Sequence, residues 1–134
     1  MKVIVDTSIW SLALRRGDQG PIPCADELRG LIQDHRVQMM GPIRQEILSG
    51  IRSESQFNTL KKHLGSFSDL PIITEDYVEA ARYFNLCRSK GIQGSNTDFL
   101  ICSVSVRNEL PIYTIDKDFQ LFTKHIPIHL HKPK

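Results

Sequence analysis

Short apolar runs alternate with longer amphipathic stretches along this chain. An apolar run over residues 2–5 precedes a helical pattern from Ser8, and another over 110–115 follows a helical pattern over 97–108. Further strand candidates are residues 37–40, 69–74 and 126–130. Strands that alternate with helical patterns are typical of a parallel sheet with helices on both faces. The pattern therefore predicts the α/β class, as a three-layer α/β/α domain with a central, mainly parallel sheet.

Helix boundaries can also be predicted from single residues. Pro42 suits the first turn of a helix that follows the second strand candidate. Thr74, with two acids after it, is expected to cap a long helix that ends near Gly91. Residues 118–125 are expected to form a short turn after the strand that ends at residue 115.

Composition limits the possible classes of protein. The 134 residues are 40% hydrophobic and 24% charged, which predicts one globular domain over residues 1–134. No apolar run approaches the ~20 residues of a membrane span and no signal segment is evident, so we expect a cytoplasmic protein. Cys24, Cys87 and Cys102 form no CxxC pair, which favours reduced thiols over a zinc site or a disulfide framework. A net charge of +2 permits nucleic-acid contact without arguing for it.

Four acids lie where a parallel sheet would build a cleft. Asp6 and Asp116 each follow an apolar strand candidate, and the carboxyl ends of parallel strands face one crevice. Asp98 lies in the first turn of an apolar helix. Glu46 borders the apolar stripe of its helix and is expected to turn partly inward. The four acids therefore form the candidate site.

Each acid also has a purely structural interpretation. Asp6 could cap the next helix, and Asp98 could complete a cap with Ser95. Asp116 could be an ordinary turn residue, and Glu46 could pair with Arg44. It is the occurrence of all four acids together that favours a functional site.

A cluster of four carboxylates needs opposite charge. Two carboxylates ~6 Å apart at an effective dielectric constant of ~20 repel by roughly 3 kcal/mol, and six such pairs would rival the whole stability of a domain. Oxygen ligands favour Mg²⁺ or Mn²⁺ over zinc. Such an ion activates water and stabilises a leaving oxygen, so the pattern predicts phosphate chemistry.

The four blocks of sequence that carry these acids resemble the PIN-domain ribonucleases of the VapC toxin type. They are "VIVDTSIW", "GPIRQEILSG", "GSNTDFLICSVSVRN" and "LPIYTIDKDF", in the order of that family over residues 2–122. The resemblance implies a PIN-like fold and an Mg²⁺- or Mn²⁺-dependent endoribonuclease. It implies metal-binding and catalytic roles for Asp6, Glu46, Asp98 and Asp116. It also implies accessory roles for Thr7 or Ser8, which could orient Asp6 or a metal-bound water, and for Thr114 and Asp118.

The resemblance also implies partners. These are an RNA substrate, a VapB-like antitoxin that would cover the active-site cleft, and a second copy of the chain in a homodimer or a larger toxin–antitoxin assembly. Basic residues that could contact RNA are Arg15, Arg16, Lys61, Lys62, Arg88, Lys90 and Lys117.

Three other functions remain alternatives. One is an inactive RNA- or partner-binding domain of the same fold. A Mg²⁺-dependent phosphatase of the haloacid dehalogenase type would need an Asp two residues after Asp6, where this chain has Ser8. A phosphoacceptor receiver domain would need further acids beside Asp6 and an Asp after the third strand candidate. RNA cleavage therefore remains the preferred interpretation.

Overall fold

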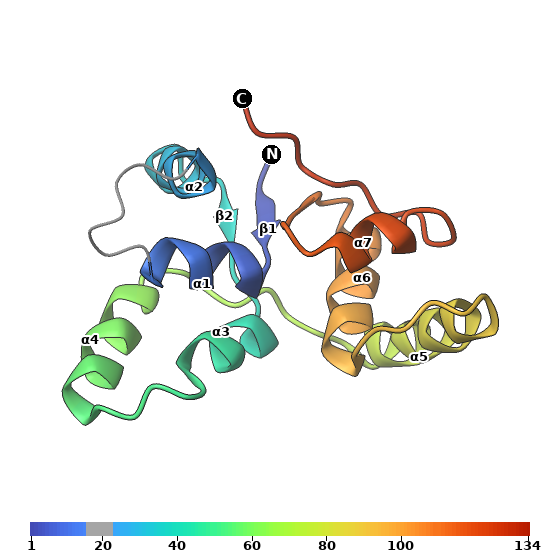
Figure 1. Ribbon diagram of the computed structural model, residues 1–134, viewed down its shortest axis with the longest axis horizontal. Coiled ribbons are helices and arrows are strands. Elements are labelled where there is room, and N and C mark those ends of the chain that lie inside the picture. The colour runs from blue at the N-terminus through green and yellow to red at the C-terminus, as the bar shows by residue number, and fades with distance from the viewer. Residues whose placement is uncertain (16–22) are drawn as a thin grey trace.

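The computed structural model describes residues 1–15 and 23–134 and shows an α/β fold (Figure 1). The strands are β1 (Val3–Val5), β2 (Val37–Gln38) and β3 (Ile112–Tyr113). The helices are α1 (Thr7–Arg15), α2 (Pro23–Gln33), α3 (Gly41–Leu48), α4 (Glu54–Leu64), α5 (Thr74–Ser89), α6 (Asn96–Asn108) and α7 (Lys117–Phe122). None of these helices is long and apolar enough to cross a bilayer.

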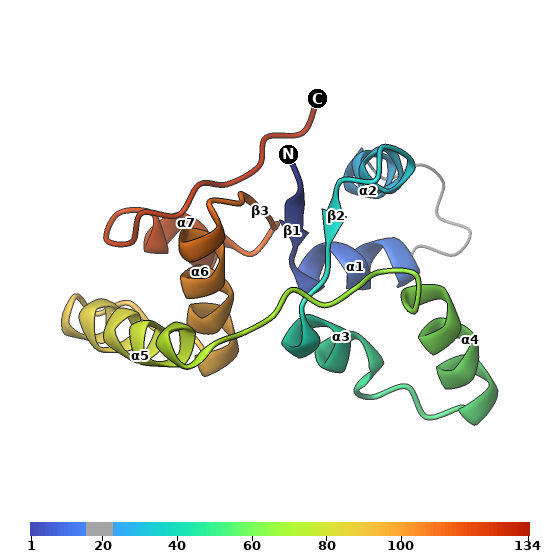
Figure 2. The same ribbon diagram turned by 180° about the vertical axis from the view of Figure 1, so that it is seen from behind.

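The sheet of the described chain is parallel, in the order β2-β1-β3. Val3 pairs with Val37 of β2, and Val5 pairs with Tyr113 of β3. All three residues of β1 are fully buried, so both faces of the central strand are covered. In both views α1–α4 lie to one side of β1 and α5–α7 to the other (Figures 1 and 2). The predicted α/β fold with a parallel sheet is confirmed.

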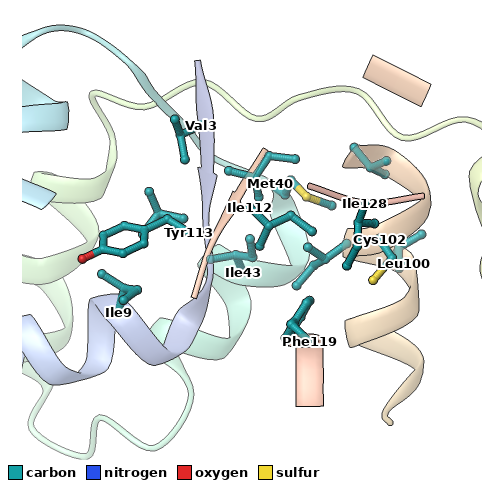
Figure 3. Packing of buried hydrophobic residues seen from close by; sticks show 14 of the residues in the cluster. Val3, Ile9, Met40, Ile43, Leu100, Cys102, Ile112, Tyr113, Phe119 and Ile128 are labelled. Atoms are coloured by element: carbon teal, nitrogen blue, oxygen red, sulfur yellow. The ribbon is translucent and has the colours of Figure 1, made fainter. Parts of the chain in front are cut away.

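The core packs on the two faces of β1. Figure 3 shows Tyr113 and Ile9 on one side of the strand and Ile112 and Ile43 on the other. All four side chains are at most 2% exposed, so the alternation along β3 sends successive residues into different parts of the core. The short strands are therefore held rigidly from both sides.

Two predicted boundaries of the helices are confirmed. Pro42 lies in the first turn of α3, where its missing N–H costs no hydrogen bond. Gly91 follows α5 with a positive φ of 75°, a backbone conformation that glycine adopts without strain. Thr74, in contrast, is the first helical residue of α5 and not its cap. Ile73 is the N-cap, and its N–H donates to Asp76 Oδ2.

The strand expected over residues 69–74 is absent from the structure. The segment makes one bridge, Met39 to Asp69, and then crosses from α4 to α5 (Figure 2). Pro71 cannot donate a hydrogen bond and Ile73 is 40% exposed, so neither pairing nor burial extends the strand. The prediction of a turn over residues 118–125 was also wrong in part, because most of this segment belongs to α7. Phe119 and Phe122 of that helix are fully buried.

Candidate active site

Asp6 lies at the carboxyl end of β1 and is 5% exposed. Its Oδ2 accepts hydrogen bonds from Ser8 Oγ and Thr114 Oγ1, both at 2.8 Å. Its backbone carbonyl accepts from the N–H of Ile9, so Asp6 also begins α1 as the structural interpretation proposed. Two neutral hydroxyl groups hold the carboxylate in place without cancelling its charge.

The same hydroxyl groups join the end of β1 to the turn after β3. Ser8 Oγ accepts from the N–H of Ile115 at 3.2 Å, and Thr114 Oγ1 accepts from the N–H of Asp116 at 3.0 Å. Asp116 is the N-cap of α7, and its Oδ1 accepts from the N–H of Asp118 at 2.9 Å. The side chain of Asp118 is exposed, and its contact with this network comes from its backbone. Asp6 and Asp116 are thus connected by a continuous set of hydrogen bonds.

Glu46 lies on α3 and is exposed, so the expectation that it turns partly inward was wrong. The reason is that Ile43 and Ile47 already fill the buried face of α3. Glu46 Oε1 accepts a hydrogen bond from Thr7 Oγ1 at 2.7 Å, which links α3 to the start of α1. Thr7 therefore contacts Glu46, whereas the sequence suggested Asp6 or a bound water.

Arg44 does not neutralise Glu46. Its guanidinium binds Asp69 Oδ1 at 2.9 Å and donates to the carbonyl groups of Leu64 and Phe67. Arg44 thereby fastens the chain after α4 to α3, and the proposed Glu46–Arg44 pair is not formed.

Asp98 lies in the first turn of α6 and completes a capping box. The N–H of Ser95 donates to Asp98 Oδ2 at 3.2 Å, and the N–H of Asp98 donates to Ser95 Oγ at 3.1 Å. Burial raises the pKa of the Asp98 carboxyl above its usual range, and the negative charges of Asp6 and Asp116 raise it further, against the hydrogen bonds from Ser95. The structural and functional interpretations of Asp98 are thus compatible, and its electrostatics link it to two other acids.

No salt bridge neutralises any of the four acids within the described chain; the ion pairs there involve Asp26, Glu27, Asp69, Asp76 and Glu79. Asp6 Oδ1, Asp98 Oδ1 and Asp116 Oδ2 also make no hydrogen bond to other described residues. These oxygens are available to water or to a ligand.

The donor chemistry of the site fits a hard divalent cation that keeps much of its water. In residues 1–15 and 23–134, no three His, Cys, Asp or Glu side chains are grouped so that they could hold a metal ion together. Mg²⁺ commonly needs only one or two carboxylates because it retains several waters. The carboxylate oxygens without protein partners suit this type of binding better than a closed cage of protein ligands.

Two features of the site lay beyond what spacing could reveal. Thr7 and Glu46 are 39 residues apart, and no local pattern predicts that they meet. Ser8 was expected near Asp6, but its second contact, with the backbone of Ile115, depends on how β1 pairs with β3. Of the basic residues suggested for RNA contact, Arg16 and the side chain of Arg15 lie outside the described residues.

The structure thus defines an α/β domain in which hydrogen bonds join Asp6 and Asp116 at the carboxyl edge of a short parallel sheet. The family model described as PIN domain matches residues 3–124, and the chain belongs to the PIN domain family.

Curated relatives extend this similarity. VapC ribonuclease Mb1587 of Mycobacterium bovis and ribonuclease VapC11 of Mycobacterium tuberculosis are each 29% identical to this chain over 126 residues. Each match covers 91% of this chain and 92% of the relative. The similarity therefore extends over nearly the full length of both proteins.

Solved structures share the fold. FitAcB from Neisseria gonorrhoeae matches with a TM-score of 0.76 at 18% identity, over 98% of this chain and 97% of the other. VapBC2 from Rickettsia felis, bound to a DNA fragment from their promoter, matches with a TM-score of 0.73 at 18% identity, over 98% of each chain. At these identities the likeness establishes the fold alone.

Proposed function

We propose that this chain is a metal-dependent endoribonuclease and the toxin of a toxin–antitoxin pair. The observation that carries the proposal is the set of four acids held by hydroxyl groups and backbone N–H groups, with no cation paired to them in the described chain. The names of the curated relatives, a VapC ribonuclease and a ribonuclease VapC11, support RNA as the substrate.

In this proposal Asp6, Asp98, Asp116 and Glu46 surround a bound Mg²⁺ or Mn²⁺, which one or two of them would contact directly and the others through its retained waters. Such an ion, when bound, activates water for attack on a phosphodiester and stabilises the leaving oxygen. Ser8 and Thr114 keep the Asp6 carboxylate in one orientation, because both hydroxyl groups donate to its Oδ2. The other oxygen, Oδ1, is then free to face the ligand. Because burial raises the pKa of the Asp98 carboxyl, a cation bound nearby would favour its ionised form.

The proposal is tested with the purified chain, freed of any partner, and structured RNAs in Mg²⁺, in Mn²⁺ and in excess chelator. We expect internal cleavage that requires the metal and is abolished by Asp6→Asn. Asp26→Asn is a matched control. Asp26 lies on α2 in an exposed ion pair with Arg29 and is not one of the four candidate acids. Equal cleavage by wild type and Asp6→Asn, or full cleavage in chelator, would contradict the proposal.

Two further assays separate the alternative functions. An inactive RNA-binding domain would retain RNA in a gel-shift assay without cleaving it. A Mg²⁺-dependent phosphatase would release inorganic phosphate from a small phosphomonoester, which we expect this chain not to do.

The toxin assignment includes a VapB-like antitoxin, a homodimer and a cytoplasmic location, where RNA is accessible. Support for the antitoxin comes from the fold shared with VapBC complexes. We expect expression of the chain to arrest growth and co-expression of the adjacent reading frame to relieve the arrest. Sedimentation at micromolar concentration tests the homodimer. Growth that is indifferent to expression would contradict the toxin role while leaving ribonuclease activity to the cleavage assay.

A further inference from the structure

Gly94 lies between α5 and α6, one residue before the Ser95 that caps α6, and has no space for a side chain. A Cβ added there would lie 2.7 Å from Phe122 Cζ and 2.9 Å from Phe99 Cε2. Carbon atoms pack at ~3.5–4.0 Å, so either distance is a severe clash. Its φ is outside the left-handed region, unlike those of Gly50 and Gly91. Gly94 is therefore required for the close approach and not for its backbone conformation.

The two rings that contact Gly94 cannot easily move away. Phe99 is 1% exposed and Phe122 is fully buried, and their centroids are 4.8 Å apart. Phe99 also packs edge-on against Phe84 at 5.7 Å, and Phe122 against Phe119 at 5.3 Å. Because protein interiors are close-packed, a shift of either ring would be passed on to the next.

These rings connect Gly94 to two of the proposed catalytic acids. Phe99 follows Asp98 directly in α6. Phe122 is the last residue of α7, and the N-cap of that helix is Asp116. The contact of Gly94 with both rings therefore sets how closely the start of α6 approaches α7.

We propose that Gly94 is a positioning residue that fixes the separation of Asp98 and Asp116, through Phe99 and Phe122. The importance of Gly94 for catalysis rests on the proposed ribonuclease function. Its effect on the separation of the two acids does not depend on that function. A methyl group at residue 94 would push α6 and α7 apart and so weaken the site without changing any carboxylate.

The first test compares Gly94→Ala with Gly30→Ala by backbone amide NMR of the whole chain. Gly30 is a matched control because a Cβ there would meet no atom within 4 Å. We expect Gly94→Ala to shift the amide signals of Asp98 and also those of Asp116 and Asp118 at the start of α7. Gly30→Ala should leave all three unchanged. Shifts confined to Asp98 and its sequence neighbours would overturn the proposal, because α7 would then be independent of Gly94.

The second test is rescue by a smaller side chain. Phe122→Leu removes the ring atoms nearest to Gly94, so Gly94→Ala combined with Phe122→Leu should return the Asp116 and Asp118 signals toward those of Phe122→Leu alone. Should Gly94→Ala fail to fold by itself, this double variant decides the matter. A double variant as perturbed as Gly94→Ala would overturn the proposed link through Phe122.

The third test measures function in the folded variants. We expect Gly94→Ala to lower Mn²⁺ affinity in calorimetry and to slow RNA cleavage by about 10²-fold, which is typical of a displacement of about 1 Å at a reactive centre. The double variant should recover part of both. Unchanged Mn²⁺ affinity and cleavage in Gly94→Ala would refute the catalytic importance of the separation. If the wild type itself does not cleave RNA, the ribonuclease proposal fails, and the amide signals still decide whether Gly94 positions the acids.

Discussion

Asp76 and Asp98 occupy the same position in two neighbouring helices but have opposite electrostatic environments. Each is the third residue of its helix, α5 or α6, and each accepts a hydrogen bond from the backbone N–H of its N-cap residue. Asp76 is 2% exposed and also binds Arg107, at 2.6 Å to Nε and 2.8 Å to Nη2. Asp98 has no such partner within the described chain.

The pKa values of the two carboxyl groups reflect this difference. The hydrogen bond from Arg107 lowers the pKa of Asp76 below its usual range, and burial raises that of Asp98. The charge of Asp76 is taken up by a structural ion pair that joins α5 to α6. A capping carboxylate without a paired cation can instead bind a charged ligand. What distinguishes Asp98 from Asp76 is therefore the missing counter-charge and not the position in the helix.

The largest expected effect is the loss of activity in Asp98→Asn. The amide keeps the cap and the volume but removes the charge, so we expect cleavage of RNA to fall by about 10³-fold, or on the order of 4 kcal/mol in transition-state stabilisation. The assay is single-turnover cleavage with saturating Mg²⁺ or Mn²⁺. Asp76→Asn, measured below its melting temperature, should cleave at close to the wild-type rate. Similar losses in the two variants would remove the functional distinction between the two caps.

Stability should respond in the opposite way. Asp76→Asn leaves Arg107 without its carboxylate partner and should lower the free energy of unfolding by about 2 kcal/mol, less than for a fully buried pair because the Arg107 side chain is 36% exposed. Urea denaturation measures this loss. Asp26→Asn breaks an exposed ion pair and should cost less than about 0.5 kcal/mol. A cost for Asp76→Asn no larger than that of Asp26→Asn would mean that the Arg107 pair does not stabilise the fold.

The pH dependence of stability should separate the two acids by sign. Because the pKa of Asp76 is lowered, its ionised form stabilises the folded chain above the usual Asp pKa of ~3.9, and this stability is lost as the pH falls through the lower folded value. Because the pKa of Asp98 is raised, ionisation opposes folding as the pH rises above ~3.9. At pH 7 we therefore expect Asp98→Asn to melt above the wild type and Asp76→Asn to melt below it.

Thermal melts from pH 3 to pH 7 test this prediction. Both differences from the wild type should shrink as the pH falls below ~4, where the carboxyl groups become protonated in the unfolded chain. A melting temperature of Asp98→Asn below that of the wild type at pH 7 would contradict the raised pKa.

The sequence predicted the positions of Asp6 and Asp116 better than it predicted the contacts that hold the four acids. Asp6 and Asp116 could be placed together because both follow buried strands, and the carboxyl ends of parallel strands share one edge. The strand expected over residues 69–74 does not form, because its apolar residues are only partly buried and Ile73 is 40% exposed. In the folded chain the segment makes a single bridge to Met39, and local composition does not reveal whether a pairing partner exists.

Neutral contacts were the hardest to predict. The helix α7 depends on the burial of Phe119 and Phe122, which tertiary packing decides. Gly94 shows no local signal either, since its requirement comes from the rings of Phe99 in α6 and Phe122 in α7. These features arise from packing between residues far apart in the sequence, which leaves no local sequence pattern.

The smallest expected effect concerns Thr7, whose hydroxyl group holds Glu46 as Arg107 holds Asp76, but without charge. Thr7→Val keeps the shape of the side chain and removes the donor. Because Glu46 is exposed and water can replace the lost bond, we expect cleavage to fall by only about fivefold, or about 1 kcal/mol. Thr7→Ser should restore it. Thr59→Val is a matched control, because the Thr59 hydroxyl bonds only within α4, to the carbonyl of Ser55. In a Glu46→Ala background, Thr7→Val should have little further effect, because the acceptor of the Thr7 hydroxyl is then absent. Additive losses in the double variant would show that Thr7 acts on something other than Glu46.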